Sequence, residues 1–433
     1  MPPARRTSID PDRLVRMLKL TPVNSNEPFN VVYIGAGNIM FGSDEGPWNH
    51  SFRFEHKLGP RLKVVALIDP NFARCEAVLE AKRLSFVESA YKNTRVYKTI
   101  DDFYADMTDA ASTIARFLLC LETKIHIFPP SRAIVVGSPP AFRGSDIPGA
   151  DLELTLLKYF PGVALFIEKP VSIHAVEKAM LVSNKIQDAE IVCSVGYMLR
   201  YLKAIQMIKA IIEENDLRVM ATTARYVCAY EKIAKPDWWN KALTCGPIVE
   251  QATHFCDLSR YFGGDVVVSS VQAHSLEFYE EAGQLSKISV DESKIPEAQR
   301  IPRVTSATWK YENGAVGTLT HLVSLQGTNY ACELEIYCDG YLFKLIDPYN
   351  APQLRIRRPG DDHEEVHHFP NDDPFFSEVS NLIDVIEGGP NADGSLILST
   401  YEDAVKSYEL TWAIRNASER NRRLPKRGLK ETA

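Results

Sequence analysis

The feature that most constrains this chain is a short buried strand that runs directly into a glycine turn. Residues 29–34 are apolar apart from Asn30, and Gly35-Ala36-Gly37 follows without a break. The first glycine of such a turn permits a tight bend, and the second lets the backbone approach the pyrophosphate of a dinucleotide at the start of a helix. Because a lone glycine pair is weak evidence, a tight strand–helix turn without a ligand is the alternative.

Strand and helix patterns alternate as far as residue 172. Strand-like runs at 63–68, 133–136 and 164–167 are separated by helix-compatible segments, which is typical of a doubly wound parallel sheet. After Pro170, helical segments give way to successive strand-like runs that include the hairpin signal Asn313-Gly314. We therefore expect an α/β Rossmann domain followed by an α+β domain with a large open, mainly antiparallel sheet. The expected divisions are a lead-in over residues 1–28, the Rossmann domain over 29–172, the α+β domain over 173–400, and a C-terminal helix with a basic tail over 401–433.

Four assignments within this scheme concern single segments. Residues 71–89 and residues 248–262 each have the periodicity of one helix. Residues 277–301 are polar and weakly patterned, and we interpret them as a loop or arm. A histidine cluster stands among acidic residues, and we interpret it as a solvated loop because a metal site would need fixed ligand spacing. Its members are His363, His367 and His368, and no metal site is predicted.

Charge and cysteine content narrow the possible function classes. The 433 residues carry 49 Lys and Arg against 56 Asp and Glu, a formal net charge of −7, which does not attract nucleic-acid backbones. Apolar runs fall well short of the roughly 20 residues that a membrane-spanning helix needs. The eight cysteines include no C-x-x-C pair, which favours reduced thiols in a cytoplasmic protein. Residues 415–430 are basic, and we interpret them as a solvated end or an anion contact.

A carboxylate after the second strand indicates which dinucleotide would bind. Asp69 can accept hydrogen bonds from both hydroxyls of the adenosine ribose and repels a 2′-phosphate, which favours NAD over NADP. NADP is not excluded, because Arg74 lies nearby in the sequence. Two departures from the usual fingerprint are Met40 in place of the third glycine and a spacing of 34 residues from Gly35 to Asp69 instead of about 20. The candidate cofactor residues in this part of the chain are Gly35, Gly37, Asn38, Ile39, Met40 and Asp69.

Two further segments carry side chains suited to acid–base chemistry. Lys169, in Glu168-Lys169-Pro170, directly follows a strand, where open α/β sheets bind ligands, although an ordinary strand-end lysine fits equally well. Glu250 and His254 are four residues apart, so one helix face can hold both, and the carboxylate can then fix the tautomer of the imidazole. A surface histidine beside a salt-bridging neighbour is the plainer interpretation, and a metal site would lack the usual second histidine. Just upstream, Trp238-Trp239 could stack on a sugar face or pack in a core.

In their order along the chain, these motifs resemble the Gfo/Idh/MocA oxidoreductase family, whose members include glucose–fructose oxidoreductase and inositol dehydrogenase. The resemblance covers about residues 30–418 and rests on the ordered set, since no single motif is specific. The motifs are the G-x-G turn, the E-K-P segment, Val135-Val136-Gly137-Ser138-Pro139-Pro140, Val195-Gly196-Tyr197-Met198-Leu199-Arg200, and Gly246-Pro247-x-x-Glu250-x-x-x-His254-x-x-Asp257.

The resemblance implies an NAD-dependent oxidoreductase that exchanges a hydride between nicotinamide and a carbinol carbon of a sugar, an inositol or a similar polyol. It implies that Lys169 touches the reacting oxygen and that His254 is the acid–base group, with Glu250 where aspartate is usual. It also implies a homodimer or homotetramer formed through the C-terminal sheet. The residues that it adds are Ser138, Pro139, Pro140 and Glu168 for the cofactor, and Tyr197, Arg200 and Asp257 for the substrate. Trp238 and Trp239, proposed from their aromatic side chains, complete the candidate substrate residues.

Departures from the family pattern predict a divergent member with an altered substrate pocket; they stand at Met40, Phe142-Arg143 and Met198. Two other functions stay open on the same fold. One is a cofactor-sensing regulatory protein without catalysis, and the other is an enzyme that uses NAD transiently for hydrolysis or elimination on a sugar. Retention of both Lys169 and His254 favours the oxidoreductase, because a sensor could lose them.

Overall fold

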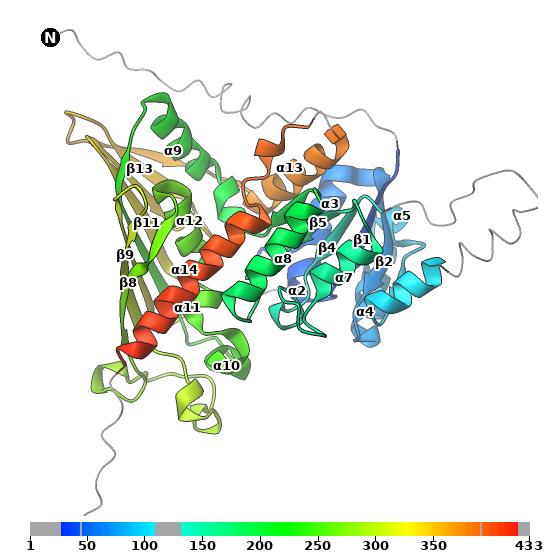
Figure 1. Ribbon diagram of the computed structural model, residues 1–433, viewed down its shortest axis with the longest axis horizontal. Coiled ribbons are helices and arrows are strands. Elements are labelled where there is room, and N and C mark those ends of the chain that lie inside the picture. Colours follow the sequence, from blue (N-terminus) through cyan, green and yellow to red (C-terminus); the bar gives the residue numbers. More distant parts are fainter. Residues whose placement is uncertain (1–26, 44–45, 109–130, 390–391, 423–433) are drawn as a thin grey trace, which may run out of the picture. The chain divides into compact units, whose positions relative to one another are not determined.

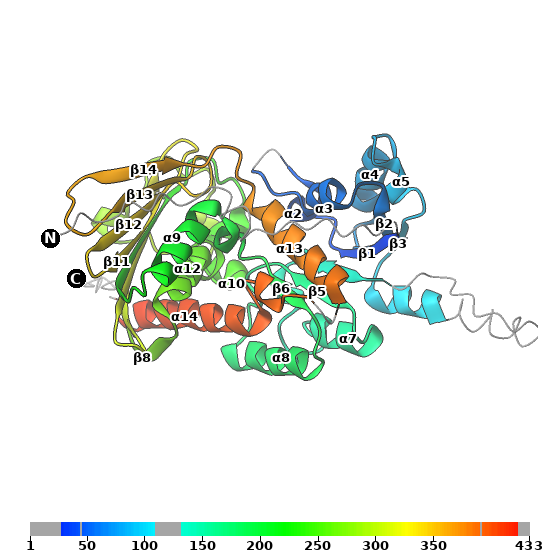
Figure 2. The ribbon, with the colours of Figure 1, turned by 90° about the horizontal axis from the view of Figure 1, so that it is seen from above.

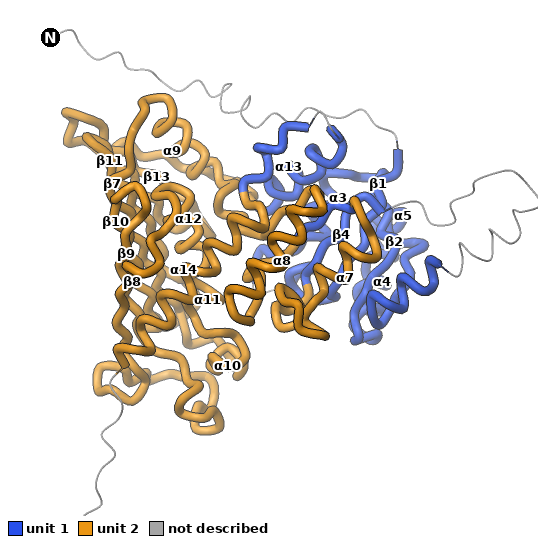
Figure 3. Tube along the Cα trace, in the orientation of Figure 1, with its two compact units in different colours: residues 1–137, 163–166, 375–398 blue, residues 138–162, 167–374, 399–433 orange. Residues whose placement is uncertain are grey.

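The computed structural model describes residues 27–43, 46–108, 131–389 and 392–422, and the chain divides into two compact units (Figure 3). The first unit takes in the chain up to Gly137 together with residues 163–166 and 375–398. The second takes in residues 138–162, 167–374 and 399–433. The boundary predicted at residue 172 does not coincide with this division, because the chain passes between the units several times.

A six-stranded sheet has the order β3-β2-β1-β4-β5-β6. This is the strand order of a doubly wound dinucleotide-binding fold, so the predicted Rossmann architecture is confirmed. Strands β1, β2, β4 and β5 of this sheet are labelled in Figure 1. Strand β1 pairs in parallel with β2 and with β4, and all of its residues are buried, which explains its apolar sequence. The strands are β1 (Phe29–Ile34), β2 (Leu62–Ile68), β3 (Arg95–Tyr97), β4 (Ala133–Val136), β5 (Ala164–Ile167) and β6 (Cys193–Val195).

The first crossover of this sheet is split into two helices. A single turn, α2 (Asn38–Phe41), ends at Gly42, whose φ of 91° lies in the left-handed region. Helix α3 (His50–Leu58) then begins at Asn49, whose side chain accepts a hydrogen bond from the Phe52 N–H. The long stretch between the first two predicted strands therefore contains the crossover helix itself.

Other helices of the first unit also differ in detail from the sequence prediction. The helix predicted over 71–89 is α4 (Phe72–Arg83) followed by the short α5 (Glu88–Tyr91). Helix α13 (Pro374–Gly388) was not predicted. It is tied to α3 by an ion pair of 2.7 Å between Lys57 Nζ and Asp384 Oδ1.

The second unit contains an eight-stranded sheet in the order β14-β13-β12-β11-β7-β10-β9-β8. Its strands β14, β13, β12, β11 and β8 are labelled in Figure 2. Strand β7 pairs in parallel with β10 and antiparallel with β11, and the remaining pairs are antiparallel. The large, mainly antiparallel sheet that we predicted is thus confirmed. Its strands are β7 (Val219–Ala229), β8 (Val266–Leu276), β9 (Val304–Tyr311), β10 (Val316–Leu325), β11 (Ala331–Cys338), β12 (Tyr341–Ile346), β13 (Gln353–Arg357) and β14 (Glu364–His368).

Strand β14 corrects one interpretation. The segment that contains His367 and His368 pairs with β13 at the edge of the sheet, so it is not a loop. Its residues are half-buried or exposed, because an edge strand has a neighbouring strand on one side only. Its sequence therefore lacks the alternation of apolar and polar residues that identifies inner strands. Within the described ranges, no group of three or more His, Cys, Asp or Glu side chains is arranged to hold a metal ion.

Helices cover one face of the eight-stranded sheet. Helix α12 (Thr253–Gly263) lies against β7. Helix α14 (Tyr401–Arg420) lies against β8 (Figures 1 and 2). Strands β9, β10 and β11 have alternating buried and more exposed residues, because their inward side chains form the core beneath the helices. The other helices of this unit are α7 (Leu152–Tyr159), α8 (Val176–Asp188), α9 (Lys203–Glu214), α10 (Lys241–Thr244) and α11 (Pro247–Glu250).

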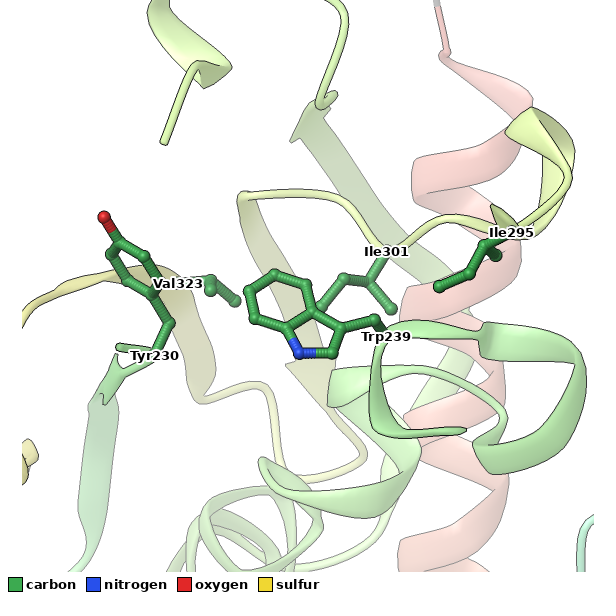
Figure 4. Close-up of a cluster of buried hydrophobic side chains, with 5 residues drawn as sticks. All are labelled: Tyr230, Trp239, Ile295, Ile301 and Val323. Atoms are coloured by element: carbon green, nitrogen blue, oxygen red, sulfur yellow. The ribbon is translucent and has the colours of Figure 1, made fainter. Parts of the chain in front are cut away.

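A satellite core corrects a second interpretation, that of residues 277–301 as an unpatterned arm. Ile295 and Ile301, from this segment, pack with Tyr230, Trp239 and Val323 in one buried cluster (Figure 4). The Trp239 side chain is fully buried, and its Nε1 donates to the Ile233 carbonyl at 3.0 Å. Trp239 is therefore a packing residue and not the substrate contact that we predicted.

Some predictions fall partly or wholly outside the described residues: the lead-in over 1–28, Cys120 and the tail beyond Arg422. The seven cysteines that the structure describes are all buried and unbridged. In this part of the chain, no helix is both long enough and apolar enough to cross a bilayer.

Candidate active site

The glycine turn of the first unit has the geometry that a pyrophosphate needs. Gly35 has a φ of 100°, which favours glycine, and its N–H donates to the Ile68 carbonyl at 2.8 Å. Gly37 precedes α2, and a Cβ atom added there would meet nothing within 4 Å. An open approach to backbone N–H groups at the start of a helix suits a phosphate group.

Met40, at the place of the third glycine, is accommodated by a glycine from another strand end. The Met40 side chain is fully buried. A Cβ atom at Gly137, directly after β4, would lie 3.2 Å from Met40 Cε and 3.3 Å from Ile39 Cγ2. Gly137 therefore leaves the space that this larger side chain takes, and the close packing that a third glycine normally permits is preserved by a different pair of residues.

Asp69 and Arg74 both hold this turn. The Asp69 carboxylate accepts hydrogen bonds of 2.8 Å from the N–H groups of Ala36 and Asn71. The Arg74 guanidinium donates to the Ala36 carbonyl and to Asn38 Oδ1. Because each carboxylate oxygen has two lone pairs, Asp69 retains acceptor capacity for ribose hydroxyls. The open turn and this carboxylate fit a dinucleotide, while the individual cofactor contacts stay predictions.

Lys169 lies directly after β5, on the second unit's side of the division. Its Nζ donates to the Glu250 carbonyl at 3.0 Å and lies 4.0 Å from Glu250 Oε1. The neighbouring Glu168 is buried, and a Cβ atom at Gly196 would lie 3.0 Å from its carboxylate oxygens. The glycine of the Val195-Gly196-Tyr197 motif is thus required by the close approach of Glu168.

The helix predicted over 248–262 is broken where the candidate residues lie. Helix α11 ends at Glu250 and α12 begins at Thr253, with the N–H groups of Phe255 and Cys256 both bonded to the Ala252 carbonyl. The break leaves the Glu250 carbonyl available to accept the Lys169 ammonium. A continuous helix would instead have engaged this carbonyl with the amide four residues further on.

The break also corrects the expected pairing of Glu250 with His254. The Glu250 carboxylate faces Lys169 and accepts a hydrogen bond of 3.2 Å from Trp238 Nε1. His254 Nδ1 is buried, and it has no hydrogen-bond partner among the residues that the structure describes. Glu250 therefore does not fix the tautomer of His254, and the prediction that the two share one continuous helix is wrong.

Gln251, inside the break, is held by a histidine that the sequence did not single out. Its Oε1 lies 3.1 Å from His321 Nε2, and its Nε2 donates to Cys228 Sγ at 3.8 Å. Burial lowers the pKa of His321 to about 3, so this ring is neutral, and it stacks on Tyr226 at 5.2 Å. These contacts fasten the break to β7 and β10, but nothing in the sequence spacing distinguishes His321 from a core residue.

His254 is held as a neutral base. Burial, and next to it the charge of Lys169, lower the pKa of His254 well below its usual value of 6.5. Tyr197 presents its ring edge to His254 at 5.8 Å and bonds Thr253 Oγ1 through its hydroxyl at 2.8 Å. Tyr349, which the sequence did not indicate, lies 6.2 Å from His254 between ring centres. A neutral imidazole near an ammonium can accept a proton from a hydroxyl that the ammonium polarises.

Arg200 and Asp257 do not contribute to this site. They form a buried ion pair with distances of 2.6 and 2.7 Å, and their side chains are only 3% and 1% exposed. Arg200 also pairs with Asp403, and Ser407 Oγ donates to Asp257 at 2.8 Å. Their predicted substrate contact is therefore replaced by a structural role in holding α14 to α12.

The turn after β4 contains the remaining predicted residues, Ser138, Pro139 and Pro140. Buried Arg143 holds it by donating to the Ser138 carbonyl at 3.1 Å and to the Val171 carbonyl at 3.2 Å. The Phe142-Arg143 departure thus has a structural explanation, since the arginine binds two strand-end segments together. The cofactor role of this turn stays a prediction.

Comparison with known protein families agrees with the two-part architecture. Residues 29–197 match the model described as the oxidoreductase family with an NAD-binding Rossmann fold, and residues 200–341 match an oxidoreductase C-terminal domain. Two uncharacterised proteins of Schizosaccharomyces pombe are similar over most of their length. UNK4.17 is 44% identical over 92% of this chain and 93% of its own, and C12C2.04 is 42% identical over 92% and 98%.

Solved structures share the fold at low sequence identity. UDP-N-acetylglucosamine 3-dehydrogenase from Acidithiobacillus ferrooxidans is 16% identical with a TM-score of 0.61, covering 90% of this chain and 98% of that one. Myo-inositol dehydrogenase from Corynebacterium glutamicum is 16% identical with a TM-score of 0.60, covering 91% and 98%. An Agrobacterium radiobacter oxidoreductase in complex with NAD+, L-tartaric acid and magnesium is 13% identical with a TM-score of 0.63, covering 91% and 97%.

Proposed function

Because this chain belongs to the Gfo/Idh/MocA oxidoreductase family and carries an NAD-binding Rossmann domain, we propose that it transfers a hydride between NAD and a carbinol or carbonyl carbon of a sugar, an inositol or a similar polyol. The observation that carries the proposal is the Lys169 ammonium, held at 3.0 Å by the Glu250 carbonyl, together with the buried imidazole of His254, whose pKa is lowered by burial and by the charge of Lys169. Two similar structures are named as dehydrogenases of myo-inositol and of UDP-N-acetylglucosamine, which supports a polyol or sugar substrate.

Two side chains of the site have different roles at the substrate oxygen, one in proton transfer and one in charge stabilisation. When bound, NAD supplies the hydride acceptor. A ring nitrogen of His254 accepts the proton of the substrate hydroxyl, because the neutral imidazole is the basic form. The Lys169 ammonium, oriented by the Glu250 carbonyl, donates to the same oxygen and stabilises the negative charge that develops there. In the reductive direction, His254 returns the proton.

Aromatic side chains around these groups support a ring-shaped substrate. Trp238 is half-buried beside Glu250, and Tyr349 lies next to His254. Aromatic rings of this kind stack against the C–H faces of sugars, while the carboxylate of Glu250 can accept a hydroxyl proton.

The test is an absorbance assay at 340 nm with NAD and a panel of inositols, sugars and sugar nucleotides. We expect at least one compound to reduce NAD, and Lys169→Ala to lower kcat/KM by about 100-fold or more, as loss of one oxyanion donor does. Lys185→Ala is the matched control, because Lys185 is exposed and forms a surface ion pair with Asp188 three residues on. If Lys169→Ala were as active as the wild type, the assignment of Lys169 would be rejected.

The same assay separates the two other functions. An NAD-assisted hydrolase or lyase would consume its substrate while the absorbance at 340 nm stayed flat. A cofactor sensor would bind NAD without turning over any compound. The presence of both Lys169 and a His254 whose pKa is lowered by burial and by the charge of Lys169 favours catalysis over sensing, because a sensor has no need for a paired acid and base.

We also propose that two copies of this chain associate through the outer face of the eight-stranded sheet. Charges on this face form ion pairs, at 2.7 Å between Arg225 and Glu333 and at 3.1 Å between Lys344 and Glu335. Leu322 of β10, the strand between β7 and β9, is half-exposed. Light scattering should give the mass of a dimer or tetramer, and Leu322→Arg should reduce it. A monomeric wild type at micromolar concentration would contradict the proposal.

A cytoplasmic location is a further part of the proposal, and the buried thiols of the described cysteines support it. Fractionation of cells that express the tagged chain would test it. Recovery in the secreted fraction would contradict it.

A further inference from the structure

A basic cavity lies in the second unit among α10, α14 and the segment 277–301. Its volume is about 470 Å³, which is in the range of small-molecule sites. Its lining includes four basic side chains but a single carboxylate, in a chain whose net charge is −7. The charged and polar lining residues are Lys241, Arg415, Arg420, Arg422, Glu419 and Gln299.

Two of the buried cations of this cavity share one carboxylate. Lys241 Nζ lies 2.8 Å and Arg415 Nε lies 3.3 Å from the same oxygen of Glu419. The side chains of Lys241 and Arg415 are only 7% and 18% exposed. A buried cation is costly unless an opposite charge compensates it, and one carboxylate compensates only one of these two.

Two further arginines, Arg420 and Arg422, line the same cavity. Arg422 Nε lies 3.4 Å from Glu277 Oε2, so its charge is matched. Arg420 has no ion-pair partner within the described part of the chain. Four cations and two carboxylates give a net charge of about +2. A phosphate group carries a charge of about −2 near neutral pH, so it would neutralise this excess.

The dipole of α14 does not account for this arrangement. Cations in the last turn of a helix are favoured by its C-terminal carbonyls, and this explains Arg420. Lys241 belongs to another element, α10, and it also lines the cavity. The convergence of basic side chains from separate elements indicates a site for an anion.

We propose that this cavity binds a phosphate-bearing anion, either inorganic phosphate or a sugar phosphate. Arginine guanidinium groups bind phosphate oxygens in pairs, and the buried lysine adds a point charge. The lining includes neither Lys169 nor His254, so the anion site is separate from the proposed catalytic groups.

The test is calorimetric titration of the full chain with sodium phosphate and with a hexose 6-phosphate. The titrations are done at constant ionic strength in chloride and with NAD present in excess, so that phosphate does not report binding at the glycine turn. We expect binding by the wild type and a loss of about tenfold in affinity for Arg420→Gln, the value of one charge-assisted hydrogen bond. Arg420 has no ion pair to lose in the described chain, so this variant should fold normally, and its melting temperature checks that.

Arg218→Gln is the matched control, because Arg218 is exposed on the loop before β7 and the substitution removes the same charge. The hexose phosphate should bind more tightly than inorganic phosphate if the sugar also fills the cavity, whereas equal affinities identify the phosphate alone as the ligand. Absence of phosphate binding by the wild type would overturn the proposal. An equal loss in Arg218→Gln, or no loss in Arg420→Gln, would also overturn it.

Discussion

Replacing Asp257 with asparagine removes one charge from a buried ion pair and leaves Arg200 in place. Breaking such a pair by removing one partner costs about 3–5 kcal/mol, because the remaining charge is buried without full compensation. We expect the lower end, about 3 kcal/mol, because Asp403 also pairs with Arg200. Ser407 Oγ, which now donates to the Asp257 carboxylate at 2.8 Å, loses a charged acceptor in the same step.

Urea unfolding followed by tryptophan fluorescence measures this cost. With a slope of about 3 kcal/mol per M, the unfolding midpoint of Asp257→Asn should fall by roughly 1 M. Asp188→Ala is the control, because its exposed pair with Lys185 at 3.4 Å is worth at most about 0.5 kcal/mol. A midpoint equal to that of the control, together with a raised KM, would refute the structural role and restore the substrate contact predicted from the sequence.

Three further predictions concern the site. His321→Gln should reduce the loss of unfolding free energy in acid, because the pKa of His321 is about 3 in the folded chain and 6.5 in the unfolded chain, so that protons bind preferentially to the unfolded state. Between pH 6.5 and pH 5, the free energy of unfolding should fall by about 2 kcal/mol less in the variant than in the wild type. An equal fall in both proteins would contradict the assigned burial of His321. Lys169→Ala should raise the pKa of His254, because it removes a nearby positive charge; NMR titration of the labelled ring would show this, and a lower pKa would contradict it. Gly137→Val should weaken NAD binding by displacing Met40, measured by calorimetry against Gly394→Val, a position without a left-handed φ where a Cβ meets nothing within 4 Å; equal affinities for both would contradict the packing argument.

The strands of both sheets could largely be predicted because the pattern of buried positions in a strand determines which of its residues are apolar. A parallel strand such as β1 is covered on both faces, so its sequence is a nearly continuous apolar run. In β9 and β10, buried and more exposed residues alternate on either side of an Asn-Gly turn. The edge strand β14 was not predicted, because its charged residues bury little surface and therefore show no apolar alternation. Helix α13 was also missed, although it is apolar on one side.

The candidate site was predictable in composition but less so in geometry. Lys169, Glu250 and His254 were identified in advance; in the second unit Lys169 lies against Glu250, and its charge lowers the pKa of buried His254, while their catalytic roles stay predictions. The break between α11 and α12 was not predicted, because it is held by groups distant in sequence, among them His321. The same residue types serve catalysis and buried ion pairs, and only the burial of Asp257 separates these roles.

Transfer of deuterium from substrate to coenzyme tests the central claim most directly. A polyol that reduces NAD would be supplied with deuterium on the reacting carbinol carbon, and the mass of the reduced coenzyme would be measured after turnover. Direct hydride transfer predicts one deuterium in each molecule of NADH and none in the solvent. Consumption of the substrate with unlabelled NADH, or with deuterium released to water, would contradict the account.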